Sequence, residues 1–154
     1  MLEELGVPYE LETLEFKPEA LQAPAFLEVH PLGKLPALRD DGLTMFESGA
    51  ILQYLLEKYG AGRMHPPPGT PESAIYLQWF HFGEASLANH MSEIVRQRFG
   101  QPTIEGSEAI LALARARFHE ALAVVDRALA GREYIAGDAF SAADLMVVYP
   151  IVMA

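Results

Sequence analysis

The spacing of apolar residues along the chain starts with a strand-like period and then becomes helical. Residues 9–16, YELETLEF, alternate with the period of two that predicts a β-strand, and Pro8 precedes them. Residues 19–29 carry apolar side chains at helical spacing and predict a short connecting helix. Pro24 limits the regularity of this helix, and Pro31 ends it.

The next segment predicts a hairpin followed by a helix. Strands at 35–38 and 43–46 flank Asp41-Gly42, a dipeptide that favours the positive φ angles of a tight hairpin turn. In residues 48–59 the apolar positions recur every three or four residues, which predicts a helix, and Gly60 stands just past its end. The predicted order up to this point is strand, helix, strand, strand, helix.

A proline-rich segment then separates this part from a helical one. Residues 60–71, GAGRMHPPPGTP, are rich in proline and glycine, which helix and strand interiors do not tolerate. From residue 75 to 129 the apolar positions follow the helical period. We therefore predict a first domain at 1–60, a linker at 61–71 and an all-helical second domain at 72–154.

The clearest helix start in the second domain lies near the end of the chain. Ser141 can cap a helix, and Asp144 can reach back to it as the third helical residue. This spacing predicts a capping box.

Both ends of the sequence carry incomplete helix signals. Residues 1–5, followed by Gly6 and Pro8, are typical of the last turn of a helix, yet an isolated helix usually needs about 12 residues. Residues 145–154 predict an apolar helix that stops without a terminal glycine. We expect the front of the first helix and the closing helices to lie outside this sequence. The alternative is that Met1 is a true start and the first residues are a frayed tail.

Composition and charge narrow the classes of partner. With 154 residues, 51% of them hydrophobic and 21% charged, the chain is long enough to bury a core. No apolar run approaches the ~20 residues of a membrane helix, and the start lacks a signal-peptide pattern. A formal charge of −10 repels phosphate backbones and anionic lipid, so we expect neither nucleic acid nor a membrane as partner.

The residue types that bind metals or form disulfides are scarce. There is no cysteine, which excludes disulfides, zinc–thiolate sites and a protein thiol nucleophile within this chain. The five histidines include no pair at i, i+4, so no metal site is predicted. We expect a cytoplasmic protein.

Several motifs occur in a characteristic order. They are ELGVPYEL at the start, HPLGKLPAL at 30–38, FESGAILQYL at 46–55 and SAADLM near the end. In these motifs the chain resembles the bacterial-type soluble glutathione transferases over essentially its whole length. The resemblance implies a thioredoxin-like α/β N-terminal domain with a mixed sheet, followed by an all-α C-terminal domain. It also implies that the first strand and the last helices are missing from this sequence.

The resemblance assigns glutathione-binding roles around Pro36. It implies a cis Leu35-Pro36 bond, which exposes the backbone groups of Leu35 so that they pair with the cysteinyl part of glutathione. On the sequence alone, a trans bond is the ordinary case. Lys34 would neutralise the glycyl carboxylate, although a lone lysine is more often an exposed residue without function. His30 stands where asparagine is commoner in the family, a departure from which we expect little consequence.

A second binding segment follows the hairpin. Glu47 and Ser48 lie where a strand turns into a helix, and the unpaired N–H groups and positive dipole end of a helix favour an anion. The resemblance implies that Ser48 binds the γ-glutamyl carboxylate and that Glu47 pairs with the α-amino group. The alternative is that Ser48 merely caps the helix.

The family's catalytic Tyr, Ser or Cys lies just after the first strand, so it is expected upstream of Met1. The chain as given is therefore expected to be inactive alone. If it were active, the hydroxyl would have to be sought among Tyr9, Ser48 and Tyr54.

The predicted activity is that of a glutathione transferase, in which the thiolate of glutathione, the cosubstrate, attacks a small electrophile and no metal takes part. A homodimer is expected from the resemblance. Two alternatives stay open: a non-catalytic interaction protein of the same fold, such as a stringent-starvation-like transcription partner, and a glutathione-dependent disulfide reductase or peroxidase.

Overall fold

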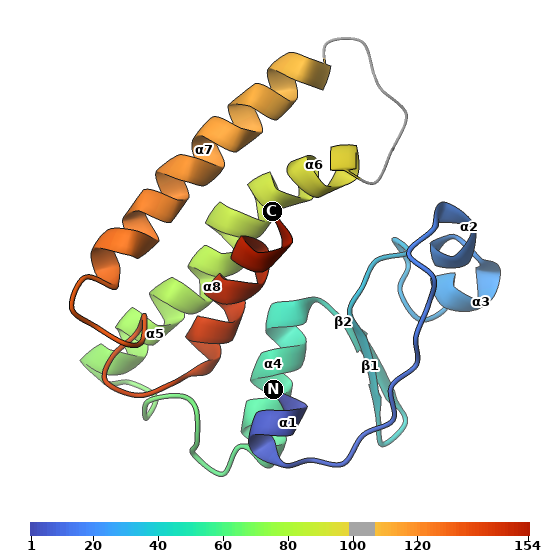
Figure 1. The fold of residues 1–154 in the computed structure, drawn as a ribbon. Coiled ribbons are helices and arrows are strands. Elements are labelled where there is room, and N and C mark those ends of the chain that lie inside the picture. Colours follow the sequence, from blue (N-terminus) through green and yellow to red (C-terminus); the bar gives the residue numbers. More distant parts are fainter. Residues whose placement is uncertain (99–106) are drawn as a thin grey trace. The chain divides into compact units, whose positions relative to one another are not determined.

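The structure is a computed structural model that describes residues 1–98 and 107–154. The chain divides into two compact units, Met1–Ala61 and Gly62–Ala154. Figure 1 shows a small sheet with helices in the first unit and a group of helices packed together in the second.

The first unit opens on a single helical turn. Helix α1, Leu2–Leu5, ends at Gly6, whose left-handed φ of 68° lets its N–H reach back to the carbonyl of Glu3. This geometry confirms the predicted helix terminus. Leu5 is buried within this first unit.

The strand predicted at residues 9–16 is not observed. In the described part of the chain the sheet has two strands, and neither pairs with this segment. An alternating pattern forms a strand only where a neighbouring strand supplies the ladder. With none beside it, the segment runs irregularly and leaves Leu11 76% and Phe16 58% exposed.

The connecting helix predicted at residues 19–29 is instead two separate turns, α2 at Pro18–Leu21 and α3 at Pro24–Leu27. Pro24 has no N–H to donate to the preceding turn, but its fixed φ suits the first position of a new one. The break between α2 and α3 therefore occurs at Pro24, the residue expected to limit the regularity of the predicted helix.

The hairpin is confirmed. Strands β1, Ala37–Asp40, and β2, Leu43–Phe46, are antiparallel, with Ala37 opposite Phe46 and Asp40 opposite Leu43. The turn residues Asp41 and Gly42 have φ of 47° and 82°. The first strand begins two residues later than predicted, because Pro36 cannot donate to the ladder.

Helix α4, Ser48–Tyr59, matches its predicted bounds and buries Ile51, Leu55 and Leu56. Gly60 follows the helix in a right-handed conformation, with φ of −70°. The left-handed turn that ends the helix comes one residue later, at Ala61, with φ of 49°.

The second unit is built on a long, continuous helical segment. Helix α5, Pro71–Phe82, passes into a π-helical segment η1, Gly83–Ala88, and then into α6, Asn89–Arg98. Helix α7, Ser107–Ala128, packs along α6 and η1, and α8, Ala142–Met153, packs against α5 and η1. The core between them includes Tyr76, Trp79, Phe80, Leu87, Phe118, Val125, Met146 and Val147.

Two local devices fix α8 in this unit. The Asp144 carboxylate accepts the N–H groups of Ser141 at 2.9 Å and of Ile135 at 2.8 Å, which confirms the predicted reach-back at the helix start. Gly83 lies so close to α8 that an added Cβ would stand 2.3 Å from the carbonyl oxygen of Met146. A side chain at this position would therefore push η1 and α8 apart.

Candidate functional site

The predicted cis peptide bond is present between Leu35 and Pro36. Leu35 is 48% exposed, and Lys34 beside it is also exposed. Because β1 begins at Ala37, the backbone groups of Leu35 take no part in the hairpin ladder. The loop thus presents an exposed stretch of main chain that an extended peptide can pair with.

The N-terminus of α4 carries an unusual backbone conformation. Glu47 is the N-cap residue, with φ of 73° and ψ of 109°. Residues other than glycine rarely adopt this backbone conformation. Its carbonyl accepts the N–H of Ile51 at 2.9 Å, which begins the helix. Ser48 is the first helical residue, so the alternative in which Ser48 is the cap does not hold. Strain of this kind is concentrated at functional sites.

The two segments lie at the same end of the hairpin. Ala37 and Phe46 are opposite each other in the ladder, where paired Cα atoms are about 4.5–5.5 Å apart. Pro36 directly precedes the first of these residues, and Glu47 directly follows the second. The fold therefore brings together the predicted site residues, Lys34, Leu35, Pro36, Glu47 and Ser48, although up to 14 positions separate them in the chain.

A polar cluster that the sequence reading missed holds the other end of the hairpin. The Asp40 carboxylate accepts hydrogen bonds from Lys58 at 2.8 Å, Tyr59 at 2.8 Å and Tyr54 at 2.9 Å. Lys58 also contacts Asp41 at 2.6 Å. The i, i+4 spacing of Tyr54 and Lys58 on one helix face was the available sequence signal. This cluster fixes the C-terminal turn of α4 to the hairpin turn.

Hydrogen bonding within the cluster shifts the pKa values of Asp40 and Lys58 in opposite directions. The hydrogen bond from Lys58, followed by that from Tyr59, lowers the pKa of Asp40 below its ordinary value. The same bond to Asp40, with a second to Asp41, raises the pKa of Lys58. The carboxylate and the ammonium thus stay charged over the whole neutral range.

The other two hydroxyls named by the sequence reading are already engaged. Tyr9 donates to Glu3 at 2.8 Å, and this bond raises the pKa of the phenol. Tyr54 donates to Asp40 in the polar cluster. Neither arrangement resembles a donor held ready for a thiolate.

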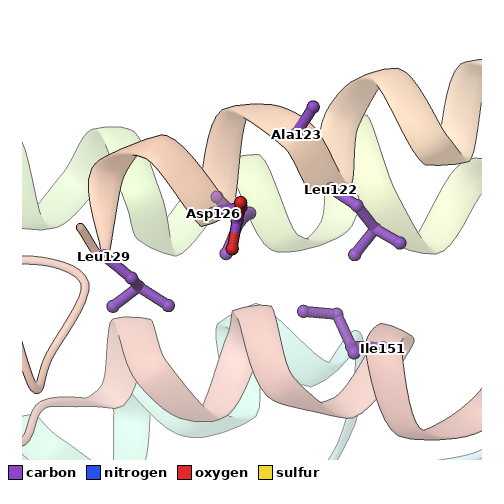
Figure 2. A pocket seen from close by; sticks show the side chains of 6 residues that line it. Leu122, Ala123, Asp126, Leu129 and Ile151 are labelled. Atoms are coloured by element: carbon purple, nitrogen blue, oxygen red, sulfur yellow. The ribbon is translucent and has the colours of Figure 1, made fainter.

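A hollow of about 410 Å³ lies in the second unit, between α7 and α8. Figure 2 shows Leu122 of α7 and Leu129, which directly follows α7, pointing toward α8, and Ile151 pointing from α8 into the same space. Asp126 is the one charged residue of its lining. None of the predicted site residues belongs to it. The lining offers no group of converging polar side chains of the kind that orient a substrate.

Across the described residues, 1–98 and 107–154, no three acidic or histidine side chains gather in a way that could hold a metal ion. Within the same ranges, none of the helices combines the length and apolar character needed to cross a bilayer.

Comparison with known proteins identifies both parts of the chain. Residues 1–57 match the model of the glutathione S-transferase N-terminal domain, and residues 108–154 match that of the glutathione S-transferase C-terminal domain.

Curated relatives cover almost the whole chain. The chain is 36% identical to glutathione S-transferase 3 of Schizosaccharomyces pombe over 98% of its own length and 66% of the relative's. It is 34% identical to the glutathione S-transferase-like protein OpS6 of Beauveria bassiana, over 96% of this chain and 68% of the relative. The chain thus spans about two thirds of the length of the curated relatives it matches.

Solved structures give the same answer. The glutathione transferase URE2P6 of Phanerochaete chrysosporium, in complex with oxidised glutathione, matches 98% of this chain and 70% of its own, with a TM-score of 0.82 and 29% identity. A glutathione transferase of Pseudomonas putida with bound glutathione disulfide has a TM-score of 0.79 and 28% identity, over 98% of this chain and 66% of that one. With a thioredoxin-like first domain and a helical second domain, the chain belongs to the glutathione transferase family.

Proposed function

We propose that the protein binds glutathione at the open end of the hairpin and directs the glutathione thiolate at small electrophiles. The observation that carries this proposal is the meeting of the cis Leu35-Pro36 bond and the strained Glu47 at one end of the β1–β2 ladder. The glutathione bound in the similar structures of Phanerochaete chrysosporium and Pseudomonas putida supports it.

Each predicted residue has a distinct part in holding the tripeptide. The main chain of Leu35 pairs with the cysteinyl residue as an added strand does, and Lys34 neutralises the glycyl carboxylate. The Ser48 hydroxyl and the N-terminus of α4 bind the γ-glutamyl carboxylate, while Glu47 pairs with the α-amino group. Pro36 holds the loop in the shape that exposes Leu35.

The chemistry is a nucleophilic attack by the substrate's own sulfur. The thiol of glutathione loses its proton, and the thiolate forms a bond to the electrophilic centre while the leaving group departs with the electron pair. A hydroxyl donor and a helix N-terminus stabilise the thiolate and lower the thiol pKa. The donor itself is left unassigned among the residues of this chain.

Replacement of Ser48 by alanine tests the site. A charge-assisted hydrogen bond contributes about 1.5–3 kcal/mol, so Ser48→Ala should raise the Kd for glutathione roughly tenfold to a hundredfold in calorimetry. Ser92 offers a matched control, because its hydroxyl donates to the carbonyl of Asn89 at 2.9 Å on α6, outside the proposed site. Ser92→Ala should leave the Kd unchanged. Equal affinities of the Ser48 variant and the wild type would remove Ser48 from the site.

The same calorimetry separates the enzyme from the non-catalytic alternative. A pure interaction module has no use for a tripeptide site, so absence of glutathione binding by the wild type would favour that reading. Turnover of a disulfide or a hydroperoxide with glutathione, without conjugation of a carbon electrophile, would favour the reductase or peroxidase.

We further propose a homodimer, on the family resemblance. Light scattering at micromolar concentration measures the mass directly. A monomeric mass would contradict this part of the proposal.

A further inference from the structure

We propose that the buried imidazole of His30 is a positioning residue that couples the two halves of the glutathione site. This inference rests on the proposed function. His30 is not one of the predicted glutathione-binding residues. His30 is only 3% exposed, in a loop whose neighbouring residues Pro31 and Leu32 are both exposed.

Three atoms of His30 hold the loop that leads to the cis bond. The His30 N–H donates to the carbonyl of Phe26 at 2.8 Å, at the end of α3. The His30 carbonyl accepts the N–H of Gly33 at 2.8 Å, and its Nδ1 accepts the N–H of Leu32 at 3.2 Å. A side-chain acceptor for the N–H two residues on is the arrangement that Asn and Asp side chains build in tight turns. The histidine ring performs this role here.

The turn is also held from outside. Gly33 is buried with φ of 59°, and a Cβ there would stand 2.3 Å from the carbonyl oxygen of Leu21 in α2. With Gly33 fixed against α2 and Leu32 fixed by the imidazole, the chain enters Lys34 and Leu35 from one defined direction. The position of the exposed Leu35 main chain follows from this turn.

The imidazole ring also contacts the second half of the site. The His30 and Phe46 ring centroids are 4.7 Å apart with a 39° angle between the ring planes. Phe46 is the last residue of β2 and directly precedes Glu47 and Ser48. One ring therefore touches both the loop that would bind the cysteinyl and glycyl parts and the strand end that would bind the γ-glutamyl part.

The chemistry of the ring requires one protonation state. Nδ1 accepts from a backbone N–H, so it carries no proton, and the neutral tautomer bears its hydrogen on Nε2. If His30 only filled space in the core, its ring would matter but the acceptor atom Nδ1 would not. The acceptor and the ring can therefore be separated by substitution.

His30→Asn and His30→Phe form the matched pair. Asn keeps an acceptor for the N–H two residues on but loses the ring against Phe46, whereas Phe keeps a ring but loses the acceptor. Calorimetry with reduced glutathione gives the Kd of each variant, and urea unfolding gives its stability. Hydrogen exchange of the Leu32 amide reports the loop hydrogen bond directly in the same samples.

We expect the two variants to rank in opposite order for stability and for glutathione affinity. His30→Phe should weaken glutathione binding about tenfold and release the Leu32 amide to exchange, while His30→Asn stays within about threefold of the wild type, although it is the less stable of the two. The exchange of the wild-type Leu32 amide tests the bond even where a variant fails to fold.

Four outcomes would overturn the proposal. Affinity that simply follows the stability of the two variants would reduce His30 to a core residue. An unprotected Leu32 amide in the folded wild type would remove the hydrogen bond itself. Wild-type protein that binds no glutathione would defeat the proposed function as well, whereas tight wild-type binding unaffected by His30→Phe would defeat only the role of His30.

Discussion

The Lys58 ammonium donates to the Asp40 carboxylate at 2.8 Å and so joins the last turn of α4 to the end of β1. Two tyrosine hydroxyls complete the coordination of the same carboxylate. Because the opposite end of this hairpin carries the proposed glutathione site, the cluster sets the orientation of the helix whose N-terminus would bind the γ-glutamyl group.

The cluster predicts an acid-dependent loss of stability. The pKa of Asp40 is lowered in the folded state, so its carboxylate stabilises the fold above its ordinary pKa of 3.8, and this contribution is lost as the pH falls through the lower folded value. Asp40→Asn should lower the urea midpoint at neutral pH and should converge with the wild type at acid pH. Glu12→Gln is the control, since its 3.5 Å contact with Arg39 is highly exposed. Parallel pH profiles of the wild type and the Asp40 variant would contradict the assignment.

Glu47 should show opposed effects on stability and binding. Glycine adopts φ of 73° without strain, so Glu47→Gly should raise the free energy of unfolding by about 1 kcal/mol while it removes the proposed partner of the glutathione amine. Glu47→Ala keeps the strained backbone and should lose the binding without the gain in stability. Urea unfolding and calorimetry on the pair separate the two effects, and equal stabilities would show that the backbone at Glu47 is unstrained.

Gly83→Ala should destabilise the helical unit. The new Cβ would lie 2.3 Å from the Met146 carbonyl oxygen, so η1 and α8 must separate at a cost of about 1–3 kcal/mol. Gly131→Ala controls for the general effect of added side chains, because nothing lies within 4 Å of its Cβ position, although its φ of 74° adds local strain. Thermal unfolding measures both, and a Gly83 variant as stable as the wild type would mean that the two helices have room to shift.

Asp144→Ala should also weaken the second unit. Its carboxylate accepts the N–H groups of Ile135 and Ser141, and hydrogen bonds to a charged acceptor contribute about 1.5–3 kcal/mol. Asp138→Ala is a suitable control, as an exposed aspartate in the irregular segment that precedes α8. Denaturant unfolding should show a lower midpoint for the Asp144 variant alone.

The regular parts of the fold were predictable from local pattern. Asp41-Gly42 fixed the hairpin turn, and the apolar spacing fixed the bounds of α4, because both signals act within a few residues. The segment at residues 9–16 was not predictable in the same way. An alternating pattern specifies which side chains share a face. A strand also needs a neighbouring strand to hydrogen-bond with, and the local pattern does not show whether one is present.

The residues of the candidate site could be predicted from the sequence, but the contacts that hold them in place could not. The cis Leu35-Pro36 bond was inferred by resemblance, since the residues alone favour the trans form. The contacts of His30 with Leu32 and Phe46 depend on how α3, the loop and β2 come together. The spacing of residues in the sequence does not indicate that a histidine ring accepts the turn hydrogen bond that an asparagine side chain usually accepts.

The π-helical segment Gly83–Ala88 sets the phase between α5 and α6. Such a segment is equivalent to one extra residue inserted into an α-helix, and each residue turns an α-helix by about 100°. Deletion of that extra residue would convert the segment to α-helix and leave α6 in its present phase, whereas α-helical winding of all the present residues would rotate α6 by that angle relative to α5. Met91 and Val95, now buried, would then turn away from the core, and polar neighbours on α6 would turn toward it. The burial of Met91 and Val95 therefore depends on the wide turn at Gly83–Ala88, which absorbs the extra residue and keeps the apolar face of α6 toward the core.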